Sequence, residues 1–169
     1  LGDRMKSYEG ISRIYLTKRM PVIIRIDGKA FHSFTKGFRR PFDEILIKAM
    51  QETSKYLCKN IMGCKIAYTQ SDEISLLLED YERAETQPWF ENNLQKIVSV
   101  SASMATMAFN RAFADAVNEG YSHYTGINAD EWTGSTEEFD KLFDNYFAKI
   151  GTAMFDSRVF ILPKEEVCN

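Results

Sequence analysis

The sequence predicts one α+β domain with a ferredoxin-like antiparallel sheet, whose elements follow one another in the order βαββαβ. Two observations support this fold class. First, β-branched apolar runs alternate in that order with segments of helical periodicity. Second, the chain has 169 residues, enough for one domain and few for two, and no repeat, low-complexity tract or Pro/Gly/Ser-rich linker divides it. We therefore expect residues 1–169 to fold as a single domain.

The first half of the chain predicts a strand, a helix and a hairpin. Residues 22–27 are apolar and β-branched and end on a carboxylate, which indicates a buried strand. Residues 42–59 carry acids in the first turn and apolar residues on one face, which indicates a helix. Residues 65–69 and 74–79 predict short strands, and the polar residues 70–73 predict a hairpin-like connection.

The second half predicts two helices and a last strand. Residues 91–118 have apolar and small residues at spacings of three and four, which predicts a helix able to lie close on a sheet. Residues 120–135 are polar and contain glycine, and we expect a loop there. Residues 136–149 predict a shorter amphipathic helix, and residues 158–162 predict the final strand.

The composition excludes a membrane protein and a disulfide-built domain. No stretch approaches the ~20 apolar residues that span a bilayer, and no secretory signal pattern is visible at the N-terminus. The cysteines, Cys58, Cys64 and Cys168, are odd in number, and their spacing fits no zinc motif. We therefore expect a reduced, cytoplasmic protein with no membrane partner.

Charge is distributed unevenly along the chain. The net charge is −3, but the first 40 residues contain ten basic and three acidic residues, a local charge of +7, and the remainder carries −10. A polyanionic partner at the N-terminal end would account for this asymmetry. A solvated basic face without a partner would account for it as well.

Acidic residues stand at two junctions that a ferredoxin-like sheet brings together. Asp27 ends the first strand, and Asp72 and Glu73 lie in the hairpin expected beside that strand. Two carboxylates at close range do not both stay ionised without compensation, which a divalent cation supplies. Mg²⁺ prefers oxygen ligands, and two such ions about 3.5–4 Å apart would hold both reacting oxygens of a phosphoryl transfer. The alternative is a turn residue at Asp27 and an ordinary polar hairpin.

The turn after Asp27 has the composition of an anion site. Consecutive backbone amides between Gly28 and His32 would form a concave site, Gly28 permits close approach, and its carbonyl suits a metal. His32 would contact a phosphate or a sugar, although a packed ring is the other interpretation. The basic residues that would neutralise a triphosphate are Lys29, Lys36, Arg39 and Arg40.

Four segments together resemble a known family. They are residues 25–34 (RIDGKAFHSF), 40–43 (RPFD), 67–75 (AYTQSDEIS) and 155–160 (FDSRVF). They resemble the tRNA-His guanylyltransferases and the guanylyltransferase-like 3′–5′ RNA polymerases, and the residues around Asp27 are closer to the bacterial, repair-type branch. The resemblance covers most of the chain, and the two acidic motifs at this separation are specific to the family.

The resemblance implies a polymerase-palm-type sheet with helices on one face and a two-metal site. Asp27 and Asp72 would bind two Mg²⁺ ions together with the Gly28 carbonyl. Glu73, the third catalytic residue implied, would support the metal-binding Asp72 without binding the metal itself. A nucleoside triphosphate would lie mostly on backbone amides. The nucleotide-binding residues implied are Asp27, Gly28, Lys29, Ala30, Phe31, His32, Ser71 and Asp72.

The resemblance further implies a tRNA substrate, GTP and ATP as nucleotide substrates, and a homotetramer. ATP would adenylylate a 5′-monophosphate, and the 3′-hydroxyl of GTP would then attack that end. The product would be a G added to tRNA-His or a repaired tRNA 5′ end. The basic residues implied as contacts to RNA phosphates or the triphosphate are Arg13, Lys18, Arg19, Lys36, Arg39 and Arg40.

Two other functions stay open, because the chain departs from the family. It ends at Asn169, where family members continue, which suggests a fragment or a shortened relative. An inactive RNA- or nucleotide-binding module would bind its ligands without turnover. A palm-type nucleotide cyclase would use a similar carboxylate pair, but diguanylate cyclases carry Gly-Gly-Asp/Glu-Glu-Phe where residues 70–74 read Gln-Ser-Asp-Glu-Ile.

Overall fold

A four-stranded antiparallel sheet forms the centre of the computed structural model, which describes residues 1–126 and 131–167. The strands are β1 (Val22–Gly28), β2 (Cys64–Gln70), β3 (Glu73–Leu78) and β4 (Phe155–Ile161). They are ordered β2-β3-β1-β4, and each neighbouring pair is antiparallel. This order is that of a ferredoxin-like sheet, so the predicted fold class is confirmed.

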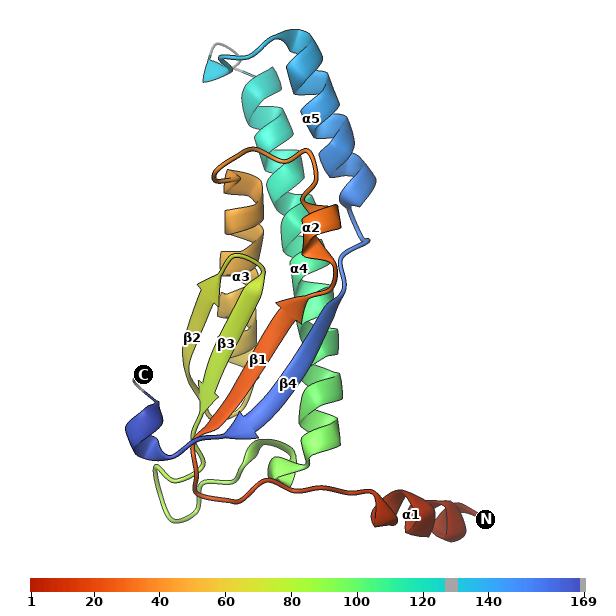
Figure 1. The fold of residues 1–169 in the computed structure, drawn as a ribbon, viewed down its shortest axis with the longest axis vertical. Helices are drawn as coiled ribbons and strands as arrows, with labels where there is room; N and C mark the ends of the chain where they lie inside the picture. The colour runs from red at the N-terminus through yellow and green to blue at the C-terminus, as the bar shows by residue number, and fades with distance from the viewer. Residues whose placement is uncertain (127–130, 168–169) are drawn as a thin grey trace.

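Two helices cover one face of the sheet. These are α3 (Glu44–Asn60) and α4 (Leu94–Thr125), which lie side by side behind the strands in Figure 1. The upper half of α4 extends beyond the sheet and packs against α5 (Thr136–Lys149). Among the described residues, no helix is both long and apolar enough to cross a bilayer.

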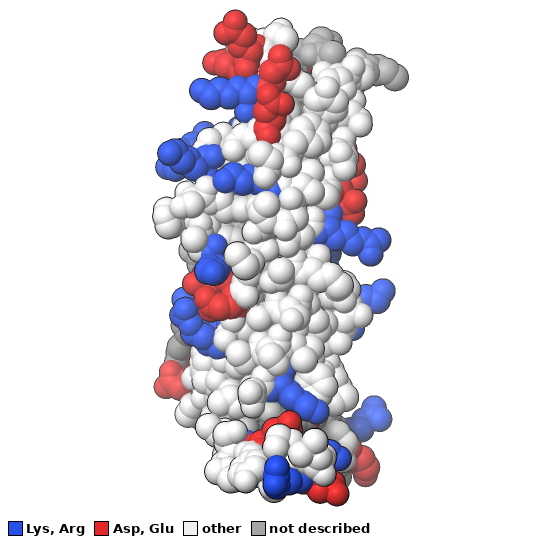
Figure 2. Space-filling model, turned by 90° about the vertical axis from the view of Figure 1, so that its right-hand side faces the viewer, with Lys and Arg blue, Asp and Glu red and all other residues white. Residues whose placement is uncertain are grey.

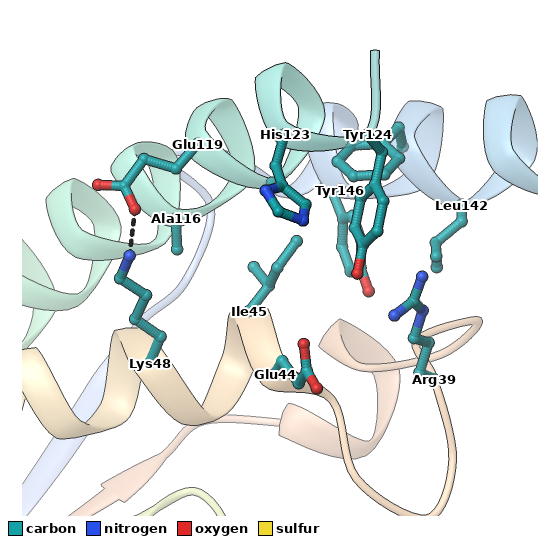
Figure 3. A pocket seen from close by; sticks show the side chains of 12 residues that line it. Arg39, Glu44, Ile45, Lys48, Ala116, Glu119, His123, Tyr124, Leu142 and Tyr146 are labelled. Carbon is teal, nitrogen blue, oxygen red and sulfur yellow. Dashed lines mark hydrogen bonds and ion pairs between the residues drawn. The ribbon is translucent and has the colours of Figure 1, made fainter. Parts of the chain in front are cut away.

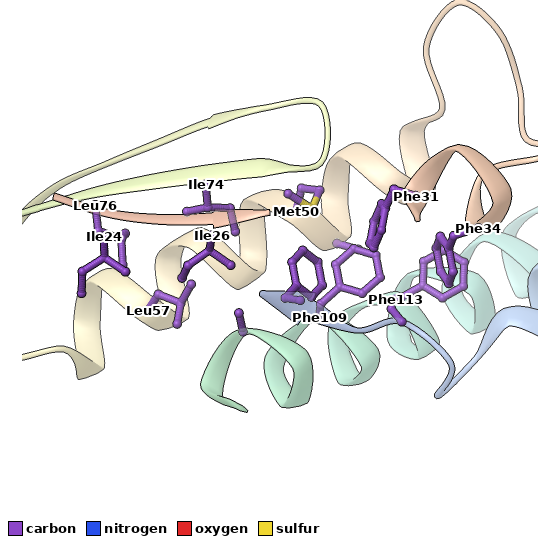
Figure 4. Close-up of a cluster of buried hydrophobic side chains, with 14 of the residues drawn as sticks. Ile24, Ile26, Phe31, Phe34, Met50, Leu57, Ile74, Leu76, Phe109 and Phe113 are labelled. Atoms are coloured by element: carbon purple, nitrogen blue, oxygen red, sulfur yellow. The ribbon is translucent and has the colours of Figure 1, made fainter. Parts of the chain in front are cut away.

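The core lies between the sheet and these helices. Ile24, Ile26, Ile74 and Leu76 point from the strands toward Leu57 of α3, and all five are fully buried (Figure 4). Beside them, two rings that follow β1 lie 4.8 Å apart and pack on rings of α4 at centroid separations of 5.4–5.8 Å. This aromatic cluster comprises Phe31, Phe34, Phe109 and Phe113. Such packing fixes the direction in which the chain leaves β1.

The helix starts follow from their capping residues. Asp43 caps α3, where its carboxylate accepts a hydrogen bond from the Leu46 amide at 2.9 Å. Asn93 caps α4 through the Lys96 amide at 3.1 Å. Ser135 forms a reciprocal capping box with Glu138 at the start of α5. Each cap satisfies an amide that has no partner inside its helix.

The expected loop over residues 120–135 is wrong in its first part, because α4 continues through Thr125. A Cβ on Gly120 would lie 3.2 Å from Ile45 Cδ1, so glycine allows close packing between α4 and α3 at this point. Packing contacts therefore override the low helix propensity of glycine. Residues 127–130 of the expected loop lie outside the described residues.

The other differences concern element ends and short elements. Strand β4 begins at Phe155 rather than at residue 158, because Phe155 and Ser157 are buried in alternation with exposed neighbours. The chain also forms α1 (Gly2–Ile11), α2 (Phe31–Phe34), η1 (Trp89–Asn92) and η3 (Lys164–Glu166). Helix α1 stands away from the sheet and contains no buried residue (Figure 1).

Candidate active site

Three carboxylate-bearing segments meet at the end of β1. Asp27 lies opposite Glu73 of β3 on one side and Asp156 of β4 on the other. The Gly28 amide donates to the Asp72 carbonyl at 3.1 Å, which ties the β2–β3 turn to the end of β1. The structure therefore places Asp27, Asp72 and Glu73 together, in the way the antiparallel register requires.

The surroundings of Asp27 raise the pKa of its carboxyl above the ordinary value. Partial burial is the largest cause, followed by the negative charges of Asp72 and Asp156. Arg158 opposes the shift, but its guanidinium is 4.0 Å from the Asp27 carboxylate and 3.6 Å from that of Asp156. Asp27 is thus an acid whose negative charge is only partly compensated within the protein.

Local hydrogen bonds hold the other two acids in place. The Ser71 hydroxyl donates to Asp72 Oδ1 at 3.0 Å, and Ser71 itself has a positive φ of 55°. The Glu73 carboxylate forms an ion pair with Arg25 of β1. Glu73 is therefore compensated within the protein, unlike Asp27, and is suited to support the site rather than to hold a cation alone.

The turn after β1 is built around Gly28 and Phe31. A Cβ on Gly28 would lie 2.3 Å from the Phe31 ring, so only glycine fits beneath that ring. The Lys29 amide donates to the Met154 carbonyl at 2.8 Å, and Ala30 starts α2 with a left-handed φ of 55°. Since the amides of Gly28 and Lys29 already have partners, an anion would meet the amides that follow, at the start of α2.

A cavity of about 870 Å³ opens beside the carboxylates. It lies between the end of β1, α2, the loop before α3 and the β2–β3 turn. Predicted site residues that line it are Gly28, Ala30, Phe31, His32, Arg39, Arg40, Ser71 and Asp72. Of these residues, Phe31 is buried, whereas His32 is exposed with its ring nitrogen 3.0 Å from the Ser33 hydroxyl.

The loop before α3 is anchored by Asp43, which sequence reasoning treated only as a first-turn acid. The buried Asp43 carboxylate accepts hydrogen bonds from the amides of Arg39 and Leu46 and from the Tyr146 hydroxyl at 2.5 Å. Burial and the neighbouring carboxylate strongly raise the pKa of Tyr146. The hydroxyl therefore stays protonated and keeps donating to Asp43.

A second cavity of about 350 Å³ lies between α3, α4 and α5 (Figure 3). Arg39 reaches toward it, with its guanidinium 5.5 Å from the ring centre of Tyr124 and 4.7 Å from that of Trp132. An ion pair between Lys48 and Glu119 closes its other side. Arg39 is thus held mainly by aromatic faces, although it also borders the cavity beside the carboxylates.

The six predicted phosphate-binding residues do not form one patch. Arg40 and Arg39 border the carboxylate cavity, and the Lys36 carbonyl accepts a hydrogen bond from Asn145 of α5. Arg13, Lys18 and Arg19 precede β1, whose seven residues separate them from Asp27 by about 20 Å. In Figure 2, the side of the molecule that carries β4 and α4 is largely uncharged in its middle, with acids and bases mixed along its margins.

Two residues of the site were missed as candidates. Asp156 and Arg158 lie on β4 beside Asp27 and Arg25, in register with them. The sequence signal that could have found them is the alternation of apolar and polar residues from Phe155 onward. The expected strand began only at residue 158, so it did not include the first residues of this alternation.

The donor set suits a cation shared with a bound ligand. Within residues 1–126 and 131–167, no group of three or more His, Cys, Asp or Glu side chains is arranged to hold a metal by itself. Asp27 and Asp72 supply two carboxylates, and Gly28 adds a carbonyl next to Asp27. Mg²⁺ is commonly held by one or two carboxylates while phosphate oxygens and water complete its coordination, so these residues fit it.

Comparison with known proteins identifies the family. Residues 2–163 match the family described as Thg1, tRNAHis guanylyltransferase. A tRNA(His) guanylyltransferase of Schizosaccharomyces pombe is 34% identical over 113 residues, which are 63% of this chain and 39% of the yeast protein. An uncharacterized protein of Acanthamoeba polyphaga mimivirus is 28% identical over 146 residues, 83% of this chain and 50% of the viral protein.

Solved structures agree with this match. A bacterial tRNA(His) guanylyltransferase (Thg1)-like protein in complex with ATP has a TM-score of 0.78 and 46% identity, covering 99% of this chain and 60% of that one. A bacterial Thg1-like protein in complex with GTP gives the same TM-score and identity, and 66% of it is covered. The chain thus spans between about two fifths and two thirds of the length of these relatives. It belongs to the tRNAHis guanylyltransferase (Thg1) family.

Proposed function

We propose that this chain catalyses nucleotide addition to the 5′ end of tRNA in the 3′–5′ direction, as a guanylyltransferase or as a 5′-end repair polymerase. The observation that carries the proposal is the convergence of Asp27 and Asp72 at the edge of a cavity in a Thg1-family fold. The raised pKa of Asp27 supports it, because an uncompensated acid cluster is what a cation-dependent site requires.

Two Mg²⁺ ions would be held by Asp27, Asp72 and the Gly28 carbonyl. When bound, they would lower the pKa of an attacking hydroxyl and stabilise charge on the phosphorus and the leaving group. Ser71 orients Asp72 through its 3.0 Å hydrogen bond. The ion pair with Arg25 fixes Glu73 beside Asp27, where it supports the site without serving as a ligand.

The cavity beside the acids would take the nucleoside triphosphate. Amides at the start of α2, after Gly28 and Lys29, would meet phosphate oxygens, and His32 and Arg40 would border the same space. Bacterial Thg1-like relatives were solved with ATP and with GTP, which supports both as substrates here.

The reaction would then run in two steps. The 5′-phosphate of tRNA attacks the α-phosphorus of ATP and releases pyrophosphate, which leaves an adenylylated 5′ end. The 3′-hydroxyl of GTP attacks that 5′-phosphorus, loses its proton and releases AMP. This chain's residues would align the attacking and leaving oxygens at the Asp27–Asp72 edge. The homotetramer that the family resemblance implies and the cytoplasmic location expected from the cysteines belong to the same proposal.

An extension assay tests this function. The protein is incubated with Mg²⁺, labelled GTP and either tRNA-His or a tRNA that lacks its first 5′ nucleotide. Each tRNA carries a 5′-monophosphate or a 5′-triphosphate end and is assayed with and without ATP. We expect label on at least one substrate and a loss of at least about a hundredfold in Asp72→Asn. Asp140→Asn on the exposed side of α5 is the control and should keep full activity. GTP binding without any label would indicate a binding module instead.

A further inference from the structure

The face of the sheet opposite the helices is exposed, and its side chains form three cross-strand rows. The row at the carboxylate end contains Gln70, Glu73, Asp27 and Asp156 in register. The next row contains Tyr68, Ser75, Arg25 and Arg158. The last contains Ile66, Leu77, Ile23 and Phe160. We call these twelve residues the open face; among the described elements, no helix covers it in Figure 1.

Large aromatic side chains are exposed on this open face. Tyr68 is 61% exposed and Phe160 is 40% exposed, although both lie on strands of the central sheet. The Tyr68 hydroxyl donates to Gln70 Oε1 at 3.2 Å, which ties the ring to its own face. Isolated exposed apolar residues are ordinary, but aromatic rings on the uncovered side of a ferredoxin-like sheet have a known use as stacking surfaces for RNA bases.

Two arginines share the open face with these aromatic side chains. Arg25 and Arg158 are neighbours across β1 and β4, and their side chains are 48% and 62% exposed. Each is paired with an acid of the adjacent row, Arg25 with Glu73 and Arg158 with Asp27 and Asp156. Exposed guanidinium groups in these positions can contact phosphates or stack on bases while they stay within reach of the acids.

The open face is continuous with the proposed reaction site. The row that contains Tyr68, Arg25 and Arg158 is two residues along the strands from the row of Asp27, a distance of about 7 Å. Tyr68 on β2 and Arg158 on β4 lie at opposite ends of one row and are three strand spacings apart, about 14 Å, which corresponds to about four stacked nucleotides. An RNA whose 5′ end reaches Asp27 therefore has its neighbouring nucleotides within range of this surface.

We propose that the open face binds unpaired nucleotides of the RNA substrate next to the reacting 5′ end, by stacking on Tyr68 and Phe160 and by phosphate contacts to Arg25 and Arg158. The proposal rests on the proposed function and names the part of the RNA that this surface recognises. In tRNA, these nucleotides would be the single-stranded 3′ end, which lies beside the 5′ end. Stacking of this kind tolerates any base, so it positions the RNA without reading its sequence.

RNA is the occupant that the observations favour over a protein segment. Two exposed arginines share this face with two exposed aromatic rings, and the acids beside them belong to the proposed site for phosphate chemistry. A protein partner would account for the apolar row of Ile66, Leu77 and Ile23 alone, but not for its continuity with the carboxylates. That alternative is an outcome of the test below.

The test uses Tyr68→Ala and Phe160→Ala, each assayed with a tRNA that has its 3′ single strand and with one trimmed to a blunt end. We expect KM for the intact tRNA to rise about tenfold in each variant, with kcat and the KM for GTP little changed. On the blunt substrate, each variant should match the unmodified protein. Tyr68→Phe should keep the low KM, because stacking does not need the hydroxyl.

Tyr8→Ala is the matched control, since Tyr8 on α1 is also 61% exposed but lies away from the open face. An unchanged KM in both open-face variants would overturn this inference while leaving the proposed function intact. An equal loss on intact and blunt substrates would also overturn it, as would a change of oligomeric state that explains the loss. Absence of nucleotide addition by the unmodified protein would instead contradict the proposed function.

Discussion

The Asp27 carboxyl lies among the acids Asp72, Glu73 and Asp156, and Arg158 is the cation that lowers its pKa. Because its pKa is raised in the folded state, ionising Asp27 costs more there than in the unfolded chain. Its contribution to stability therefore declines as pH rises from the ordinary carboxyl value through the raised one. A bound cation reverses this effect, since it favours the ionised form.

The first prediction concerns the competition between protons and Mg²⁺ at Asp27. At neutral pH, Mg²⁺ at a hundredfold excess over its Kd should raise the Tm by roughly 5–10 °C. The shift should shrink as pH falls through the raised pKa of Asp27, and it should be absent in Asp27→Asn. That variant should melt at or above the Tm of the unmodified protein without Mg²⁺. A full Mg²⁺ shift in Asp27→Asn, measured by differential scanning fluorimetry, would contradict the assignment.

The second prediction concerns the buried acid that anchors the loop before α3. Tyr146→Phe removes one of three donors to the Asp43 carboxylate and should lower the free energy of unfolding by about 1.5–3 kcal/mol, measured by urea denaturation. Tyr121→Phe is the control, because Tyr121 is 41% exposed and packs through its ring on Phe143, and it should change stability by less than about 0.5 kcal/mol. Equal effects of the two substitutions would show that the Asp43 bond is not stabilising.

At the same scale, the sequence alone predicted the position of some residues of the candidate site and not of others. The meeting of Asp27 and Asp72 was predictable, because Asp27 is near the end of one clear strand and Asp72 is in the turn between two others. The role of Asp43 was not predictable, because its partner Tyr146 is 103 positions away in the sequence. The role of Asp156 was not predictable either, because it depends on the register between β1 and β4. Engagement of the Gly28 and Lys29 amides by Asp72 and Met154 depends on the fold in the same way.

At the scale of elements, β1, β3, α3 and α5 were predictable nearly to their ends, since their apolar periodicity decides their type. The end of α4 and the start of β4 were not, because packing of Gly120 on Ile45 and burial of Phe155 decide them. Helix α2 was also missed, since its four residues are too few for a periodicity. Local pattern thus fixes an element's type, and tertiary contact sets its limits.

The third prediction concerns how β1 passes into α2. Gly28→Ala would place a methyl group 2.3 Å from the Phe31 ring, so α2 has to shift or the ring has to leave the core. We expect a loss of about 1–3 kcal/mol in unfolding free energy and weaker GTP binding, measured by denaturation and by calorimetry. Gly10→Ala in α1 is the control, because nothing lies within 4 Å of its added Cβ. Unchanged GTP affinity in Gly28→Ala would separate this turn from the nucleotide site.

At the scale of the whole molecule, basic residues fall into two groups at opposite ends of β1. Arg39 and Arg40 lie by the carboxylate cavity, and Arg13, Lys18 and Arg19 lie before the strand begins. The excess of positive charge in the first 40 residues is therefore not one binding patch. An RNA that engages both groups has to extend at least about 20 Å from its reacting end.

This separation gives the fourth prediction, which depends on substrate length. A double variant, Arg13→Gln with Lys18→Gln, should weaken binding of intact tRNA and make the slope of log K against log salt less steep by up to about two. It should leave binding of a hairpin with about four base pairs unchanged, because the helix of such an RNA is shorter than the separation of the two basic groups. Lys55→Gln with Lys59→Gln on α3 removes the same charge from the helical layer and should affect neither RNA.

If the short hairpin also loses affinity in the variant of Arg13 and Lys18, those residues lie within reach of the reacting 5′ end, and the two basic groups act as one site. If neither RNA is affected, the N-terminal charges are a solvated face, and RNA affinity resides in the carboxylate end and the open face alone.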